Sequence, residues 1–148
     1  MPLLKQLSLF LENEPGHLKA PCQALARAGI DILTMSLADT QQFGILRLIV
    51  RDWERARKVL EAAGQVVNVT ELLALDIPDQ PGGLAAVLEV FEKTGLGVEY
   101  MYPFSVRAPG QAATLLFRLE QPDQAVVALQ ASGVKLVSAA TLYQRAGA

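Results

Sequence analysis

The chain has 148 residues, 51% of them hydrophobic and 19% charged, with 13 lysines and arginines against 15 aspartates and glutamates. This balance is typical of a globular protein, and scattered basic residues with a net charge of -2 argue against nucleic acid as a partner. No stretch approaches the roughly 18 uninterrupted apolar residues of a membrane span, and the N-terminus lacks the apolar centre of a signal peptide. A single cysteine fits a reducing compartment, so we expect a cytoplasmic protein without a membrane partner.

In the first half of the chain, segments with an apolar residue at every second position alternate with segments with one at every third or fourth position. Alternation indicates strands, and recurrence at three and four residues indicates helices. The expected elements are a strand at 7–11, a helix at 18–25, strands at 32–37 and 45–50, a helix at 56–63 and a last short strand. Glycines at positions 29 and 64 mark the ends of the two helices.

The second half repeats this order. NEPGHL at 13–18 aligns with DQPGGL at 79–84 at an offset of 66 residues, and an offset of 69 later pairs Leu73 with Leu142. The expected elements of the second copy are a strand at 73–77, a helix at 84–91, strands at 98–104 and 113–119, a helix at 125–129 and a last short strand. The order βαββαβ, present twice, predicts an α+β protein with two tandem ferredoxin-like domains, residues 1–70 and 71–148.

Each domain should place both helices on one face of an antiparallel sheet. The other face is not uniformly polar, because it carries Phe10, Ile45, Ile49 and Leu116, and exposed apolar area usually marks an interface. Edge strands also need covering. We therefore expect the two domains to pair side by side into a shared sheet and the protein to form a homodimer through the open face.

The Pro-Gly turns, preceded by Asn13 and Asp79, allow two interpretations. In the first, the Asn or Asp side chain accepts hydrogen bonds from backbone N–H groups and simply caps the turn. In the second, the unpaired N–H groups at the start of the helix bind an anion, which Gly16, Gly82 and Gly83 would allow to approach closely. Neither turn has the Lys and Ser or Thr of a triphosphate site. The second interpretation predicts a small ligand with one carboxylate.

His17 is the only histidine, and Gly83 takes its place in the repeat. The turn therefore does not need an imidazole, and we expect His17 to line a pocket rather than act as a base. With one His, one Cys and no repeated carboxylate pair, we expect no enzyme activity, and no His, Cys and carboxylate cluster has metal-ligand spacing. Pro21 would interrupt a helix that began at Gly16 or His17, so that helix either starts late or bends.

Two tandem βαββαβ units with N/D-x-P-G-x-L in each first turn resemble ACT domains, the ligand-sensing modules attached to many enzymes of amino-acid metabolism. The resemblance covers Leu4 to about Gln144. The stretches MSLADTQQFGILRLIV at 35–50 and VEYMYPF at 98–104 are similar to those of small stand-alone tandem-ACT proteins that bind amino acids.

The resemblance implies amino-acid sites where the first turn of one domain meets the second strand of its neighbour. The first implied site joins Asn13, Glu14, Pro15, Gly16, His17 and Leu18 to Tyr100, Met101 and Tyr102. The second joins Asp79, Gly82, Gly83 and Leu84 to Met35, Ser36, Leu37 and Ala38. Asp39, with Asn13 or Asp79, would take the ammonium group, and helix-end N–H groups would take the carboxylate.

These features predict a non-catalytic, allosteric amino-acid sensor that needs no cofactor. Its ligand would strengthen the interface between ACT units and so alter binding to a metabolic enzyme or a regulator. Tyr100, Tyr102 and Phe104 favour an apolar or aromatic amino acid. The alternative is a structural regulatory subunit of a metabolic enzyme, with no ligand pocket in use.

Overall fold

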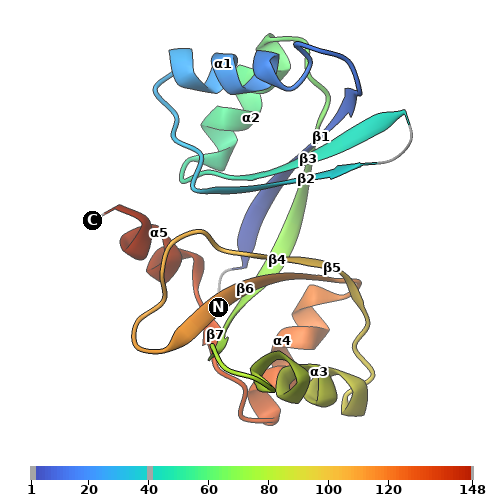
Figure 1. The fold of residues 1–148 in the computed structure, drawn as a ribbon, viewed down its shortest axis with the longest axis vertical. Coiled ribbons are helices and arrows are strands. Elements are labelled where there is room, and N and C mark those ends of the chain that lie inside the picture. Colours follow the sequence, from blue (N-terminus) through green and yellow to red (C-terminus); the bar gives the residue numbers. More distant parts are fainter. Residues whose placement is uncertain (1–2, 40–41, 148) are drawn as a thin grey trace. The chain divides into compact units, whose positions relative to one another are not determined.

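The computed structural model describes residues 3–39 and 42–147 of the chain. The polypeptide divides into two compact units (Figure 1). The N-terminal unit runs over Lys5–Thr70, and the C-terminal unit holds the described residues from Glu71 onward together with Leu3 and Leu4. Strand β4 (Val67–Pro78) begins in the first unit and ends in the second.

The N-terminal unit has the predicted order of strands and helices. Its elements are β1 (Leu4–Glu12), α1 (Lys19–Arg27), β2 (Thr34–Asp39), β3 (Phe43–Ile49) and α2 (Trp53–Ala62), followed by the start of β4. β3 pairs antiparallel with both β1 and β2, and β4 is the other neighbour of β1. This arrangement is a βαββαβ unit.

The strands of this unit have one buried and one more open face. Leu7 and Leu9 of β1 and Leu46 and Leu48 of β3 are fully buried and form one core with side chains of α1 and α2. Phe10, which lies between Leu9 and Leu11 in β1, keeps 60% of its surface exposed. Such alternation is expected for a sheet covered by helices on one side, and Figure 1 shows α1 and α2 together on one side of β1, β2 and β3.

Helix α1 begins after the Pro-Gly turn rather than inside it. It runs from Lys19, so Pro21 is its third residue and lies in the first turn. Backbone N–H groups in the first turn have no partner within a helix, so proline removes no intrahelical hydrogen bond there. The two alternatives for Pro21 are thereby resolved in favour of a late start.

The C-terminal unit repeats this arrangement. After β4 come α3 (Gly83–Lys93), β5 (Val98–Pro103), β6 (Ala112–Leu119), α4 (Pro122–Ala131), β7 (Leu136–Val137) and α5 (Ala139–Gly147). β6 pairs antiparallel with β4 and β5, and β7 pairs antiparallel with β4. In its core the rings of Phe91 and Phe117 meet edge to face, with centroids 5.1 Å apart.

Helix α5 is an element that the repeat does not predict. The match between Leu142 and Leu73 is wrong, because Leu142 lies in α5 while Leu73 lies in β4. The last strand shrinks to β7, and the chain then turns at Ser138, whose Oγ accepts a hydrogen bond from the Thr141 N–H at 3.2 Å. A serine in this position caps a helix. This local signal is stronger than the weak apolar match across the repeat.

Helix α5 lies on the opposite face of the sheet from α3 and α4. Ile77 of β4 belongs to the core beneath those two helices, so its neighbour Asp76 points to the other face. Arg145 of α5 forms an ion pair with Asp76 and therefore lies on that other face. Leu116, which the sequence assigns to an open face, is on the same side as Asp76 and is fully buried.

The α+β class and the two tandem ferredoxin-like units predicted from the sequence are confirmed. The side-by-side pairing of the units and dimerisation remain predictions. On the expected open face of the N-terminal unit Phe10 is exposed and Ile45 partly buried, but Ile49 is fully buried. No helix in the described part of the chain has both the length and the apolar character needed to cross a bilayer.

Candidate ligand-binding site

The two Pro-Gly turns have the same backbone geometry. In Glu14–His17 and in Gln80–Gly83 the last N–H donates to the first carbonyl oxygen, at 3.2 and 3.0 Å. The third residues, Gly16 and Gly82, have φ of 92° and 87°. Pro at the second position and a positive φ at the third define a type II turn, which strongly favours glycine at the third position. The Pro-Gly pairs thus serve the turn itself.

Asn13 and Asp79 contribute main-chain rather than side-chain hydrogen bonds. Their N–H groups donate to the carbonyl oxygens of Gln42 and Gln111, at 3.2 and 2.8 Å. The residues directly before α1 and α3 make no side-chain cap hydrogen bond either. The capped-turn interpretation is therefore wrong about how the turns are held. The first N–H groups of both helices are left without a side-chain cap.

The turns differ at their fourth position. A Cβ on Gly83 would lie 2.1 Å from the carbonyl oxygen of Pro78, so a side chain does not fit there. In the first turn the same position holds His17, whose Nε2 lies 3.7 Å from a carboxylate oxygen of Glu14 and whose side chain is 41% exposed. Only the first turn, therefore, can present a side chain from this position.

A pocket of about 290 Å³, the turn pocket, lies at the first turn. It is formed within the N-terminal unit by the end of β1, the turn, the start of α1 and the facing ends of β2 and β3. Its lining residues are Leu11, Glu12, Asn13, Glu14, Leu18, Leu37, Ala38, Asp39 and Gly44. Six of them, all except Leu11, Glu12 and Gly44, are site residues predicted from the sequence.

The turn pocket combines an apolar wall with acidic groups. The apolar side chains are Leu11, Leu18 and Leu37, and the acidic ones are Glu12, Glu14 and Asp39. Leu18 and Leu37 are 39% and 52% exposed, so a ligand could cover apolar surface there. None of the described lining residues is a lysine or arginine. The arrangement suits a ligand with an ammonium group and an apolar part.

Comparison with known proteins identifies the family. Residues 2–144 match the family model described as an ACT domain pair. The chain belongs to the ACT domain pair family. Its structure is similar to that of the protein BT0572 from Bacteroides thetaiotaomicron, with 36% sequence identity and a TM-score of 0.86, over 95% of this chain and 96% of that one.

Two further solved structures share the fold at lower identity. The regulatory subunit of aspartate kinase from Thermus thermophilus, in its ligand-free form, is 17% identical with a TM-score of 0.63, over 90% of this chain and 92% of that one. The corresponding subunit from Thermus flavus is 16% identical with a TM-score of 0.60, over 98% and 94%. A search of curated protein sequences finds no match.

The remaining predicted site residues of this ACT pair lie outside the turn pocket. Leu84 and Met101 pack against the core of the second ACT unit, and Tyr102 is buried. Met35 and Ser36 are on β2, Tyr100 is on β5, and Pro15, Gly16, His17, Gly82 and Gly83 form the turns. The turn pocket joins the first turn to β2 of the same unit. A site shared between the turn of one ACT unit and the strand of the other remains a prediction.

The second ACT turn has a different chemical setting. Asp79 lines a cavity of about 410 Å³ together with residues from the segment Pro103–Thr114, including Arg107. A basic side chain is thus present in this cavity, whereas the charged residues described in the lining of the turn pocket are all acidic. The two turns have the same backbone geometry, but the charged residues that line the cavities beside them differ.

Glu12, Glu14 and His17 form a cluster that the spacing did not predict. One potential ligand atom from each lies within 4.8 Å of the others. The expectation that no such cluster exists is wrong, because the tight turn returns the chain toward Glu14 and brings His17 close to it. Carboxylate oxygens and a histidine nitrogen are groups that can bind a divalent cation.

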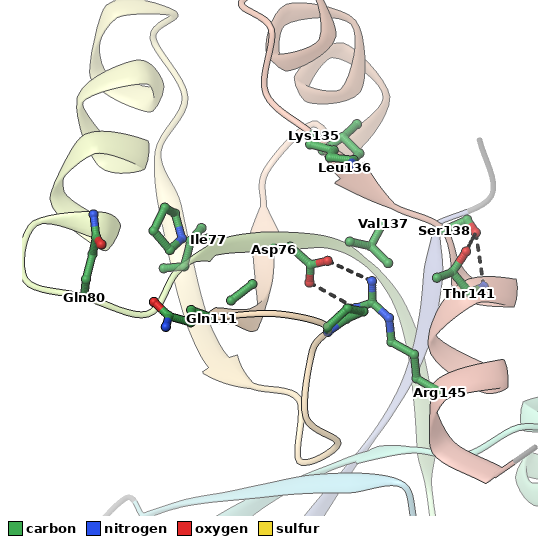
Figure 2. Close-up of a pocket in the computed structure, with 13 residues that line it drawn as sticks. Asp76, Ile77, Gln80, Gln111, Lys135, Leu136, Val137, Ser138, Thr141 and Arg145 are labelled. Carbon is green, nitrogen blue, oxygen red and sulfur yellow. Dashed lines mark hydrogen bonds and ion pairs between the residues drawn. The ribbon is translucent and has the colours of Figure 1, made fainter.

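A larger cavity of about 750 Å³, the α5 cavity, lies in the second ACT unit (Figure 2). It was missed from the sequence because α5 was missed. Its lining residues are Asp76, Ile77, Pro78, Gln80, Pro109, Gln111, Ala112, Lys135, Leu136, Val137, Ser138, Thr141 and Arg145. They come from the end of β4, the segments before β6 and around β7, and α5.

Asp76 and Arg145 form a two-point ion pair in this cavity. Arg145 Nη1 and Nη2 donate to the two carboxylate oxygens of Asp76 at 3.0 and 2.8 Å, and the Thr114 hydroxyl donates to the first of them at 2.6 Å. Burial acts to raise the pKa of Asp76, but the hydrogen bonds from Arg145 and Thr114 and the charges of Arg145 and Lys135 outweigh it. The pKa of Asp76 therefore lies below its ordinary value, and this carboxylate is ionised at neutral pH.

Proposed function

We propose that this protein is a non-catalytic sensor that binds a free amino acid in the turn pocket and thereby regulates a metabolic enzyme or regulator. The observation that carries the proposal is the turn pocket itself. It gathers Asn13, Leu18 and Asp39 at one place, next to the uncapped N-terminus of α1. Membership of the ACT domain pair family supports a regulatory role. We expect this role in the cytoplasm.

The proposed binding mode uses both ends of an amino acid. The carboxylate accepts hydrogen bonds from the N–H groups of Leu18 and Lys19 at the start of α1. The next two positions cannot take part, because the Ala20 N–H already donates to the Gly16 carbonyl oxygen and Pro21 has no N–H. The ammonium group binds Asp39, with Asn13 as a neutral hydrogen-bond partner. The side chain packs against Leu37 and its leucine neighbours, which favours an apolar amino acid.

The test is a thermal-shift panel of free amino acids on the whole chain. A ligand present at 100 times its dissociation constant should stabilise the fold by about 2.7 kcal/mol. At roughly 2 to 4 °C per kcal/mol this is a rise of about 5 to 11 °C in Tm. Asp39→Asn should weaken binding of the best ligand by about tenfold or more, because it removes a charged hydrogen-bond partner.

Asp31→Asn is the matched control, because Asp31 is an exposed acid of the same unit that does not line the turn pocket. It should leave the affinity unchanged. A panel without any shift would contradict amino-acid binding. If the protein then co-purified with an enzyme, the alternative of a structural regulatory subunit would be favoured.

A further inference from the structure

The α5 cavity depends on α5, a helix without a counterpart in the described part of the first ACT unit. Six of its lining residues lie in β7, in α5 or directly beside one of them, between Lys135 and Arg145. In the first unit β4 follows α2 and leads directly into the second unit, so no helix corresponds to α5. At about 750 Å³ the α5 cavity is within the size range of small-molecule sites. It shares no lining residue with the turn pocket.

The single carboxylate in the cavity is already satisfied. Both oxygens of Asp76 accept hydrogen bonds from Arg145, and one of them also accepts from Thr114. Lys135 is a second cation in the lining and is exposed. Two cations against one carboxylate leave the α5 cavity with one positive charge in excess. The cavity therefore has no acidic group left to bind an ammonium group.

Hydrogen-bond donors remain available around this charge. Arg145 uses three of its five N–H donors on Asp76 and Thr114. Ser138 and Thr141 share one hydrogen bond of 2.9 Å between their hydroxyl oxygens, which uses only one of the two hydroxyl protons. Figure 2 shows these hydroxyls on one side of the ion pair and two glutamine side chains on the other.

The rest of the lining is apolar. Pro78 and Val137 come from β4 and β7, lie on the same face of the sheet as Asp76, and are joined by Pro109 from the segment before β6. Ile77 and Leu136 also line the cavity, but their side chains belong to the core beneath α3 and α4. A cavity with one excess positive charge, free donors and an apolar wall is complementary to an anion that carries a hydrocarbon part. The turn pocket has the opposite character, since its described lining holds three carboxylates and no cation.

We propose that the α5 cavity is a second ligand site, specific for a small organic monocarboxylate without an ammonium group. The carboxylate binds between Lys135 and the free N–H donors of Arg145, and the hydrocarbon part packs against Pro78 and Val137. This site is independent of amino-acid binding in the turn pocket. The protein then responds to two ligands of different charge, one in each ACT unit.

The test is a titration of the whole ¹⁵N-labelled chain with sodium butanoate, followed by amide chemical shifts, at constant ionic strength. Concentrations up to about 50 mM cover the millimolar dissociation constants expected for so small a probe. Butanoate should produce saturable shifts at the amides of residues 76, 77, 79, 80, 110–112 and 135–141. Butylamine, which has the same hydrocarbon chain and the opposite charge, should produce none there.

Lys135→Gln should weaken butanoate binding by about fivefold, the effect of one exposed charge, and Lys135→Arg should restore it. Lys58→Gln is the control, because Lys58 is an exposed lysine on α2 in the other ACT unit. It should bind butanoate as the unmodified chain does. The absence of saturable shifts at these residues, equal binding of butylamine, or full affinity in Lys135→Gln would each overturn the proposal. Amino-acid binding is read separately at the amides of 37–39 and 44, so failure of one site does not imply failure of the other.

Discussion

Replacing Gly83 with alanine should destabilise the second ACT unit, although alanine is the better helix former. Gly83 is the first residue of α3, and an added Cβ would lie 2.1 Å from the carbonyl oxygen of Pro78. Contacts below 3.0 Å are essentially never observed for a Cβ, so the two backbones must separate by at least 0.9 Å, the difference between 3.0 and 2.1. Both are held, because Pro78 is paired with Ala112 of β6 and the Gly83 N–H donates to Gln80 at 3.0 Å.

The expected size of the effect follows from two opposing contributions. Overpacking of this kind costs about 1 to 3 kcal/mol. Alanine recovers up to about 1 kcal/mol through its helix propensity. The net loss at Gly83 should be roughly 1 to 2 kcal/mol, or about 2 to 8 °C in Tm for a chain of this size.

The assay is urea and thermal unfolding of Gly83→Ala beside His17→Ala. His17 occupies the same position of the first turn and already carries a Cβ, so its replacement removes only an exposed contact with Glu14. His17→Ala should change stability by no more than about 0.5 kcal/mol. If Gly83→Ala were as stable as the unmodified chain, or more stable, helix propensity would outweigh the close approach and the reasoning would be refuted.

Three further predictions concern other parts of the chain. Asp76→Asn leaves Arg145 unpaired in a half-buried setting and should cost about 3 kcal/mol in urea unfolding at neutral pH. Because the pKa of Asp76 is lowered in the folded state, the ionised carboxylate stabilises the fold above about pH 4, and this contribution is lost as the pH falls through the folded pKa. The unfolding free energies of the unmodified chain and Asp76→Asn should therefore converge in acid. A difference in unfolding free energy that did not change with pH would contradict this. Asp52→Ala should cost about 1 kcal/mol and Asp52→Asn almost nothing, because the Asp52 side chain caps α2 by accepting from the Arg55 N–H at 3.2 Å. Phe10→Ser should weaken a dimer in sedimentation and leave the fold of the monomer intact, since Phe10 is 60% exposed. A protein that is monomeric at every concentration would remove the dimer prediction.

The fold was predictable because its signals are local and occur twice. Alternating leucines in β1 and the Pro-Gly turn before α1 each follow from a few adjacent residues. In the second half of the chain, the same two signals occur again before and at the turn that contains Gly82. Helix α5 broke the repeat, and its own signal, the Ser138 cap, was hidden by an apolar match between Leu142 and Leu73.

The candidate site was predictable only in part. Residues of the turn and of β2 could be named from the motif and from the family resemblance, and the structure brings six of them together. Sequence alone did not show that Leu11 and Glu12 complete the pocket, because strand residues next to a turn carry no signal of their own. Nor did it show that His17 faces Glu14 rather than the pocket.

The sequence by itself determined the order of the elements as far as β7 and the two Pro-Gly turns. The turns follow from the sequence because the positive φ at Gly16 and Gly82 is a backbone conformation that few residues other than glycine adopt. Only the tertiary structure decided which charged groups neutralise one another. Asp76 and Arg145 are 69 residues apart and meet because α5 folds across the sheet. Such a pairing depends on the path of the chain, which local periodicity does not encode. Because it neutralises Asp76, it leaves the α5 cavity with the excess positive charge of its two cations.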